Sequence, residues 1–317
     1  MKDGKVLVVG GAGYIGGYLT DLFEFEGYDV TVYDNLTYET RYLKRVNFIN
    51  GDIRDTHKLQ NIVHYYGTVI WLAGMVGDGA CQVDPELTNE LNFESVKWLA
   101  DNYYGRILFP STCSVYGIND ALIDETAEPN PLSAYASTKL AAEQYLMRTR
   151  LDCLIFRLGT LYGLGDAHSR LRLDLVVNIL TKRAVEGQKL SVFGGEQWRP
   201  LLHVRDVAHA FLFGLKNNVR GLYNLSANNM RIAEIAEVIK KVIPSAQVEY
   251  KDIKFEDLRN YRVTNQKILD TGWKPTLTLK DGIAELKKVF NEKRITNLND
   301  PVYSNQAFIK NKFGKED

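Results

Sequence analysis

The sequence contains 317 residues, with 39 Lys and Arg side chains against 39 Asp and Glu side chains, so its formal net charge is zero. A balanced charge disfavours binding to nucleic acid or to an anionic membrane surface, because both need a surplus of Lys and Arg. The length fits two domains or one large one, and the 45% hydrophobic content supplies a core. Three scattered cysteines, Cys81, Cys113 and Cys153, form no disulfide framework and favour a reducing compartment.

The sequence shows no signal-peptide pattern before its first apolar run. Its longest apolar stretch, near residues 69–75, is far shorter than the ~20 residues that cross a bilayer. No cysteine or histidine pair has the spacing of a metal site. We therefore expect a cytoplasmic globular protein with no membrane span and no metal.

The first half of the chain alternates short apolar strands with helices. Strands are predicted at residues 5–9, 29–33, 46–49, 69–73, 107–110 and 153–158. Helical spacing of apolar residues occurs between several of them, at 14–25, 90–103 and 135–149. Buried strands that alternate with helices predict a doubly wound α/β fold with a parallel sheet.

The pattern is less regular after residue 160. Helices are predicted at 171–185 and 206–215 and a short strand at 190–193, and the segments 222–225, 232–242, 248–250 and 279–289 continue a mixed α+β pattern. We expect a nucleotide-binding domain at 1–160, to which some later segments return, and a smaller α+β substrate-binding region at 161–290. The polar residues 291–317 are expected to form an extended tail, either disordered or docked on a neighbour.

A glycine-rich turn, Gly-Gly-Ala-Gly-Tyr-Ile-Gly at residues 10–16, follows the first strand and opens the first helix. It satisfies G-x-G-x-x-G through Gly11, Gly13 and Gly16, and a G-x-x-G-x-x-G variant that starts at Gly10. These glycines permit a tight turn and a close approach to a diphosphate, which the helix N-terminus also attracts. We expect a dinucleotide at this turn.

Asp34 ends the second strand, 18 residues after Gly16, where a carboxylate accepts hydrogen bonds from the adenosine ribose. It would repel a 2′-phosphate, and no Lys or Arg follows before Arg41, so NAD is favoured over NADP. A simple turn formed with Asn35 is the alternative. Asp52 and the following Ile53 either meet the adenine or form an Asx-turn.

Tyr135 and Lys139 stand four residues apart in a predicted helix, so both side chains share one face. A nearby ammonium favours the phenolate, so we expect Lys139 to lower the pKa of Tyr135 and to make it an acid/base for a hydroxyl group. Thr112 follows the fifth strand, at the edge of the sheet that forms the ligand crevice.

With these motifs in order, the sequence resembles the extended short-chain dehydrogenase/reductase family, in its branch of NAD-dependent nucleotide-sugar epimerases and dehydratases. Further matching segments lie at residues 111–117, 198–206, 223–224 and 271–275. The resemblance covers residues 5 to about 290 and implies a Rossmann domain, NAD and a nucleotide-diphosphate sugar substrate. It also implies a homodimer, built by the helices at 90–103 and 135–149.

The resemblance implies roles for individual residues. The catalytic set is Thr112, Tyr135 and Lys139. The cofactor site comprises Gly10, Gly13, Tyr14, Ile15, Gly16, Asp34, Asn35, Asp52, Ile53, Leu72, Ala73, Gly74, Asn92, Tyr135, Lys139 and Leu158. The substrate site comprises Thr112, Cys113, Asn178, Arg199 and Arg259, with the two arginines on the diphosphate. Arg205 is expected to form a structural ion pair.

The resemblance also bears on the reaction. The 4,6-dehydratases carry Asp-Glu where this chain has Cys113 and Ser114, which argues against dehydration. A 3,5-epimerase would use Cys113 as an acid/base, with His168 in place of a second base near Leu175; the alternative is a small, buried, unreactive Cys113. Asp174 and Asn178 are either substrate contacts or solvated positions of a helix.

Residues 171–178, 156–160, 75–77 and 272–275 look more like GDP-heptose C4 dehydrogenases than galactose epimerases. We therefore expect NAD-linked oxidation or reduction at C4 of a nucleotide sugar, with 4-epimerisation as the alternative. A non-catalytic NAD-binding regulator is the alternative from another class, and the retained Thr112, Tyr135 and Lys139 argue against it.

Overall fold

The computed structural model describes residues 4–39, 41–251, 259–295 and 297–314. Its centre is a parallel sheet with the strand order β11–β7–β5–β4–β1–β2–β3. The strands are β1 (Lys5–Val9), β2 (Asp29–Asp34), β3 (Asn47–Asn50), β4 (Thr68–Trp71), β5 (Arg106–Thr112), β7 (Cys153–Leu158) and β11 (Gly221–Leu225). The order reverses beside β1, so the carboxyl ends of β1 and β4 border the crevice where doubly wound sheets bind ligands.

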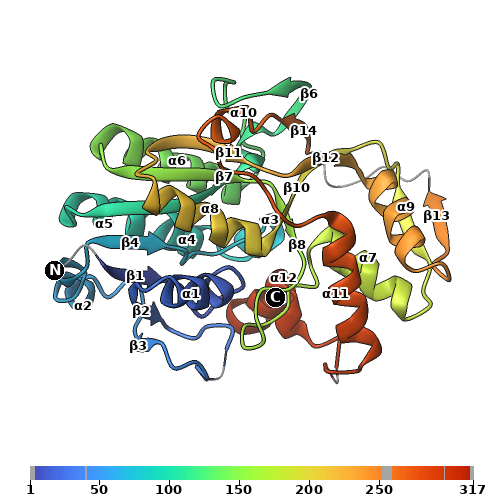
Figure 1. The fold of residues 1–317 in the computed structure, drawn as a ribbon, viewed down its shortest axis with the longest axis horizontal. Helices are drawn as coiled ribbons and strands as arrows, with labels where there is room; N and C mark the ends of the chain where they lie inside the picture. Colours follow the sequence, from blue (N-terminus) through green and yellow to red (C-terminus); the bar gives the residue numbers. More distant parts are fainter. Residues whose placement is uncertain (1–3, 40, 252–258, 296, 315–317) are drawn as a thin grey trace.

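Helices cover both faces of this sheet (Figure 1). Val6 and Val8 of β1 pack toward α1 (Gly16–Phe25) and α8 (Val204–Lys216). Leu7 and Val9 point to the other face, toward α5 (Ser95–Asn102) and α6 (Ala134–Thr149). Because successive side chains of a strand alternate between faces, continuous apolar strands bury both faces of the sheet, and the doubly wound prediction is confirmed.

Shorter elements connect the strands. They are α2 (Thr56–Gln60), η2 (Val63–Tyr65), α3 (Asp78–Val83), α4 (Pro85–Asn89), the π-helical turn η3 (Glu90–Glu94) and η4 (Cys113–Tyr116). The helix predicted at 90–103 is therefore η3 followed by α5.

Two segments from the later part of the chain belong to the central sheet and its cover. Strand β11 pairs in parallel with β7, with Leu222 opposite Ile155. Helix α8 packs beside α1. The sheet is therefore completed by residues that lie beyond position 160.

The smaller lobe is built around α7 (Val176–Val185), α9 (Ile232–Val242) and α11 (Leu279–Asn291), which share a core and lie together at the right of Figure 1. Its strands are β6 (Ile118–Ile123), β8 (Thr160–Tyr162), β9 (Leu190–Phe193), β10 (Trp198–His203), β12 (Asn228–Arg231), β13 (Val248–Lys251) and β14 (Asn260–Val263), and α10 (Gln266–Leu269) follows them. Arg205 forms an ion pair with Glu285, as predicted.

The helix predicted at 171–185 begins later than expected, at Val176. Residues 171–175 form a loop in which the Arg172 guanidinium pairs with the Asp174 carboxylate at 2.6 Å. The Leu173 amide donates to the carbonyl of Tyr303, 2.8 Å away, instead of to a helical partner. Asp174 therefore precedes the helix and does not occupy a solvated helix position.

The prediction of an extended tail at 291–317 is wrong. The turn η5 (Pro301–Tyr303) and the helix α12 (Asn305–Phe313) pack on this same chain, with α12 against α3. The side chain of Ser304 accepts a hydrogen bond from the Ala307 amide and caps α12, and Ile309 is buried. Residues 296 and 315–317 of the tail lie outside the described part.

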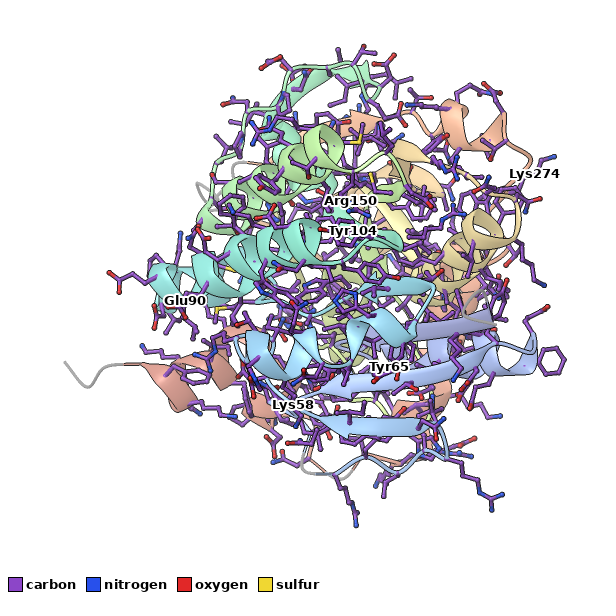
Figure 2. The ribbon with its side chains drawn as sticks, turned by 90° about the vertical axis from the view of Figure 1, so that its left-hand side faces the viewer. Lys58, Tyr65, Glu90, Tyr104, Arg150 and Lys274 are labelled. Atoms are coloured by element: carbon purple, nitrogen blue, oxygen red, sulfur yellow. The ribbon has the colours of Figure 1, made fainter. Side chains whose placement is uncertain are left out.

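The opposite edge of the sheet, where the strands begin, faces the viewer in Figure 2. Exposed Tyr65 and Tyr104 precede β4 and β5, and the Arg150 guanidinium lies 5.7 Å from the ring centroid of Tyr104. Within the described residues, no helix has the length and apolarity that a membrane crossing requires. The three cysteines are buried thiols.

Candidate active site

A cleft of about 670 Å³ opens between the carboxyl edge of the sheet and the smaller lobe. Its walls come from the loops that follow β1, β2, β4 and β5, from α6, and from residues of the smaller lobe and α12. This volume falls within the range of small-molecule and cofactor sites.

The turn between β1 and α1 fits a diphosphate group. Gly10 has a φ of +81°, and a Cβ atom there would lie 2.4 Å from the backbone nitrogen of Ala73. A Cβ at Gly13 would meet only the Gly10 carbonyl oxygen, at 3.4 Å, so the cleft side of this turn stays open to a ligand. No side chain caps the N-terminus of α1, and its first turn carries no acidic residue. The exposed end of the helix dipole therefore faces the cleft, where it favours an anion.

Asp34, at the end of β2, is fixed by two backbone amides. Its Oδ2 accepts from the Ala12 amide at 3.0 Å and its Oδ1 from the Leu36 amide at 2.8 Å. Burial raises the pKa of this carboxyl, while those hydrogen bonds lower it. The carboxylate lines the cleft beside the glycine turn.

Asp52 also lines the cleft, but its carboxylate is engaged by protein groups. Arg54 donates from Nε to Oδ1 and from Nη2 to Oδ2, each at 2.9 Å, and Asn35 donates to Oδ2 at 3.1 Å. The hydrogen bonds from Arg54 lower the pKa of Asp52 to about 2. This favours a structural turn, with Ile53 as the apolar wall beside it.

Asn92 reaches the cleft from η3 and holds the loop after β4. Its Oδ1 accepts from the Met75 amide at 2.8 Å, and its Nδ2 donates to the Met75 carbonyl at 2.9 Å. A Cβ atom at Gly74 would lie 2.6 Å from this Oδ1. Asn92 thus positions the backbone at residues 72–75, which lines the cleft.

Thr112, Tyr135 and Lys139 come together in the cleft as predicted. Thr112 ends β5, and the other two lie one turn apart in α6, which Ser133 caps by accepting from the Ala136 amide. The Lys139 Nζ atom lies 3.9 Å from the ring centroid of Phe109 on β5. The sheet and α6 therefore place a hydroxyl, a phenol and an amine in one pocket.

The pKa of Tyr135 differs from the expectation. Burial raises it above the ordinary value of 10, the nearby Cys81 and Asp78 also raise it, and a hydrogen bond with Thr112 lowers it. Burial lowers the pKa of Lys139 from 10.5 to about 7, against the opposing effect of Glu143. The predicted fall in the Tyr135 pKa caused by Lys139 is thus absent here, because the amine itself has lost its surrounding water.

Arg199 and Arg259 both line the smaller-lobe side of the cleft. Arg199 is buried, and its Nη1 donates to the carbonyl oxygens of Trp198 at 2.8 Å and Arg259 at 2.6 Å. The Arg259 guanidinium pairs with the Asp78 carboxylate at 2.8 Å. These contacts bring the two guanidinium groups into one region of the cleft.

Two of the predicted substrate contacts lie outside the cleft lining. Cys113 is fully buried, and its thiol donates to the Arg157 carbonyl at 3.2 Å. Asn178 is fully buried and bonds to the Gly163 amide, the Arg172 carbonyl and the Tyr14 hydroxyl. His168 is exposed and also lies outside the lining. The prediction of substrate contacts by Cys113 and Asn178 is therefore wrong, since their polar groups face protein atoms.

The remaining predicted residues all line the cleft, and sequence reasoning missed several others there. The predicted set is Gly10, Gly13, Tyr14, Ile15, Gly16, Asp34, Asn35, Asp52, Ile53, Leu72, Ala73, Gly74, Asn92, Thr112, Tyr135, Lys139, Leu158, Arg199 and Arg259. The missed polar residues include Asp78, Arg170, Arg172 and Asn305. No local motif marks these four: Asp78, Arg170 and Asn305 have partners far along the chain, whereas Arg172 pairs with the nearby Asp174.

Comparisons with known proteins agree with this geometry. The family model described as "NAD dependent epimerase/dehydratase family" matches residues 6–226. A putative UDP-glucose 4-epimerase of Methanocaldococcus jannaschii is 28% identical over 310 residues, covering 90% of this chain and 97% of the relative.

Two solved structures share the fold. The Thermus thermophilus UDP-glucose 4-epimerase in complex with NAD superposes with a TM-score of 0.78 at 25% identity, covering 90% of this chain and 99% of that one. The Thermotoga maritima UDP-glucose 4-epimerase gives a TM-score of 0.79 at 24% identity, covering 92% and 100%. Because the family model spans more than half of the sequence, the chain belongs to the NAD dependent epimerase/dehydratase family and is an NAD-dependent enzyme.

Proposed function

We propose that this protein is an NAD-dependent oxidoreductase acting at C4 of a nucleotide-diphosphate sugar, as a 4-dehydrogenase or 4-ketoreductase. The observation that carries the proposal is the grouping of Thr112, Tyr135 and Lys139 in the cleft that also contains Asp34 and the glycine turn. One end of the cleft fits a dinucleotide, and the other presents an acid/base pair for a hydroxyl group.

Tyr135 is the acid/base, and Thr112 is the hydrogen-bond partner of the reacting hydroxyl. A bound NAD⁺ would supply the hydride acceptor for this reaction. Burial raises the pKa of Tyr135 in this structure and so disfavours the phenolate that removes a proton. A positive charge close to the phenol would oppose this effect. Lys139, whose pKa burial lowers to about 7, favours the phenolate only while it holds its proton.

Arg199 and Arg259 are proposed to bind the diphosphate of the substrate. Guanidinium groups form paired hydrogen bonds with phosphate oxygens, and Arg199 is already buried and oriented by two carbonyl groups. A local anion site of this kind is compatible with a net charge of zero.

The 4-epimerase alternative is supported by the relatives, which include proteins named as UDP-glucose 4-epimerases. Both readings begin with the same removal of a proton and a hydride at C4. They differ in the fate of the hydride. In an epimerase the hydride returns to the same sugar, whereas in a dehydrogenase it stays on the nicotinamide and the sugar is released in its oxidised form.

The structure disfavours two other reactions. Cys113 and Ser114 stand where dehydratases carry carboxyl groups. Cys113 and His168 do not fit the acid/base pair of a 3,5-epimerase, because burial raises the pKa of the Cys113 thiol and His168 lies outside the described cleft lining.

Mixing the protein and NAD⁺ with individual nucleotide sugars, while following NADH absorbance and the sugar products, tests the proposal. Stoichiometric NADH with an oxidised sugar supports the dehydrogenase. An epimerised sugar without lasting NADH supports the epimerase. A Tyr135→Phe variant with full turnover would refute the assignment of the acid/base.

We also propose a cytoplasmic homodimer formed through α5 and α6, which pack together beside the sheet. Three unpaired thiols suit a reducing compartment. Residues 1–160, 161–290 and 291–317 remain the proposed functional divisions, with β11 and α8 assigned to the first. Sedimentation of the purified protein tests the dimer.

A further inference from the structure

The segment at residues 301–314 forms one wall of the cleft. After α11, the chain passes through η5 into α12. The residues of this segment that line the cleft are Ser304, Asn305, Gln306, Ile309 and Phe313. A segment of mostly polar sequence thus contributes a side of the site that no sequence motif marks.

Asn305 anchors the start of α12 to two cleft loops, with only 2% of its surface exposed. Its Nδ2 donates to the Val76 carbonyl at 2.7 Å, in the loop after β4. Its backbone amide donates to Asp174 Oδ2 at 2.9 Å, and its Oδ1 accepts from Arg170. A single buried amide side chain therefore joins α12 to the loop at 75–77 and the loop at 170–174.

The far end of α12 reaches the loop that follows Asp34. The Lys312 Nζ atom donates to the Thr37 carbonyl at 3.1 Å. The rings of Phe308 and Tyr38 lie 5.0 Å apart, and the Arg170 guanidinium lies 3.9 Å from the Tyr38 ring centroid. Thr37 and Tyr38 are only three and four positions beyond the carboxylate proposed to hold the adenosine ribose.

The middle of α12 packs on α3. Ile309 is 2% exposed and shares an apolar cluster with Met75, Ala80 and Cys81. The same cluster includes Tyr135 at its margin. Helix α12 thus spans from the loop after β2 to the helix beside the catalytic tyrosine.

We propose that helix α12 closes the cleft over the bound dinucleotide and slows its release. The inference rests on the proposed orientation of the cofactor, with its ribose at Asp34 and its nicotinamide near Tyr135 and Lys139. A dinucleotide in that orientation lies between the two regions that α12 connects. Its departure requires the contacts of Asn305, Phe308 and Lys312 to open first.

The test measures the release rate of NADH without any sugar. NADH-loaded protein is mixed with excess NAD⁺, and the change in NADH fluorescence gives the dissociation rate constant. Asn305→Ala is expected to raise it about tenfold, because both hydrogen bonds of the buried side chain, to the Val76 carbonyl and from Arg170, are lost. Lys312→Ala removes the hydrogen bond to the Thr37 carbonyl, and Phe308→Ala removes the ring contact with Tyr38. Each is expected to raise the rate about threefold.

Lys310→Ala is the matched control, since Lys310 lies in the same helix with an exposed side chain, and it should leave the rate unchanged. Circular dichroism establishes that each variant is folded. If Asn305→Ala does not fold, Lys312→Ala and Phe308→Ala decide the question. Folded variants that bind NADH and release it at the wild-type rate would overturn the proposal that α12 slows release. A wild-type protein that binds no NADH would instead refute the cofactor orientation and with it the proposed function.

Discussion

Lys139 should lower the stability of the cofactor-free protein. Its side chain is only 7% exposed, its Nζ lies over the Phe109 ring, and burial lowers its pKa from 10.5 to about 7. A pKa that is lower by about 3.5 corresponds to a free energy of about 5 kcal/mol that disfavours the protonated amine in the folded protein. At a pH at which Lys139 is protonated in the wild-type protein, Lys139→Met should therefore raise the unfolding free energy by at most this amount.

The sign of the pH dependence follows from proton binding. Between the folded pKa of about 7 and the unfolded value of 10.5, the unfolded chain holds a proton that the folded protein has lost. Raising the pH in this window therefore stabilises the wild-type protein relative to Lys139→Met, by about 1.4 kcal/mol per pH unit. Below about pH 7 both states are protonated, and the advantage of the variant is largest and constant.

Urea unfolding of the two cofactor-free proteins across a pH series measures this difference. We expect Lys139→Met to be more stable by several kcal/mol at about pH 6, and to lose about 3 kcal/mol of that advantage by about pH 9.5. Lys97→Met is the control, because Lys97 is exposed in α5, and its difference from wild type should be nearly constant across this range. A pH-independent difference for Lys139→Met, or a loss of stability at about pH 6, would refute the reasoning.

Other changes have distinct expected outcomes. Tyr135→Phe should lower turnover by about 10²–10⁴-fold while NADH affinity stays within about threefold, as measured by steady-state kinetics and fluorescence titration. Asp34→Asn should weaken NAD⁺ binding about tenfold and reduce the preference for NAD⁺ over NADP⁺. An unchanged ratio of the affinities for NAD⁺ and NADP⁺ would contradict the role of Asp34 in binding the ribose. Cys113→Ala should leave turnover within about twofold, because the thiol lies outside the cleft lining, whereas a hundredfold loss would revive the 3,5-epimerase reading. Asn178→Ala should lower the unfolding free energy by about 2–3 kcal/mol in urea titrations without changing the KM for the sugar, and the reverse pattern would make Asn178 a substrate contact.

The sheet and much of the candidate site could be predicted because local pattern determines them. The glycine turn directly follows β1, and Asp34 and Thr112 are the last residues of β2 and β5. All parallel strands of one sheet end at the same edge. The pairing of Tyr135 with Lys139 depends only on helical spacing. For these residues, position along the chain was sufficient to predict position in space.

Other features could not be predicted because they depend on distant partners. Arg259 is held by Asp78, and Arg170 by Asn305, across long stretches of sequence. Helix α12 has only nine residues, too few for a stable isolated helix, so its stability comes from the surface on which it packs. Asn178 was assigned to substrate through the family resemblance, with a solvated helix position as the alternative, but the structure directs both ends of its amide to protein groups.

The pairing of β11 with β7 has a consequence for dividing the chain. A fragment ending near residue 160 would keep the glycine turn and Tyr135 but would lack β11 and α8. The edge of β7 would then expose its unpaired backbone groups, and Leu154 and Phe156 would lose their cover from Phe211. Exposed, apolar strand edges recruit other chains. The nucleotide-binding half should therefore aggregate when expressed alone, and an independently folding version requires residues 204–225 to be joined to it.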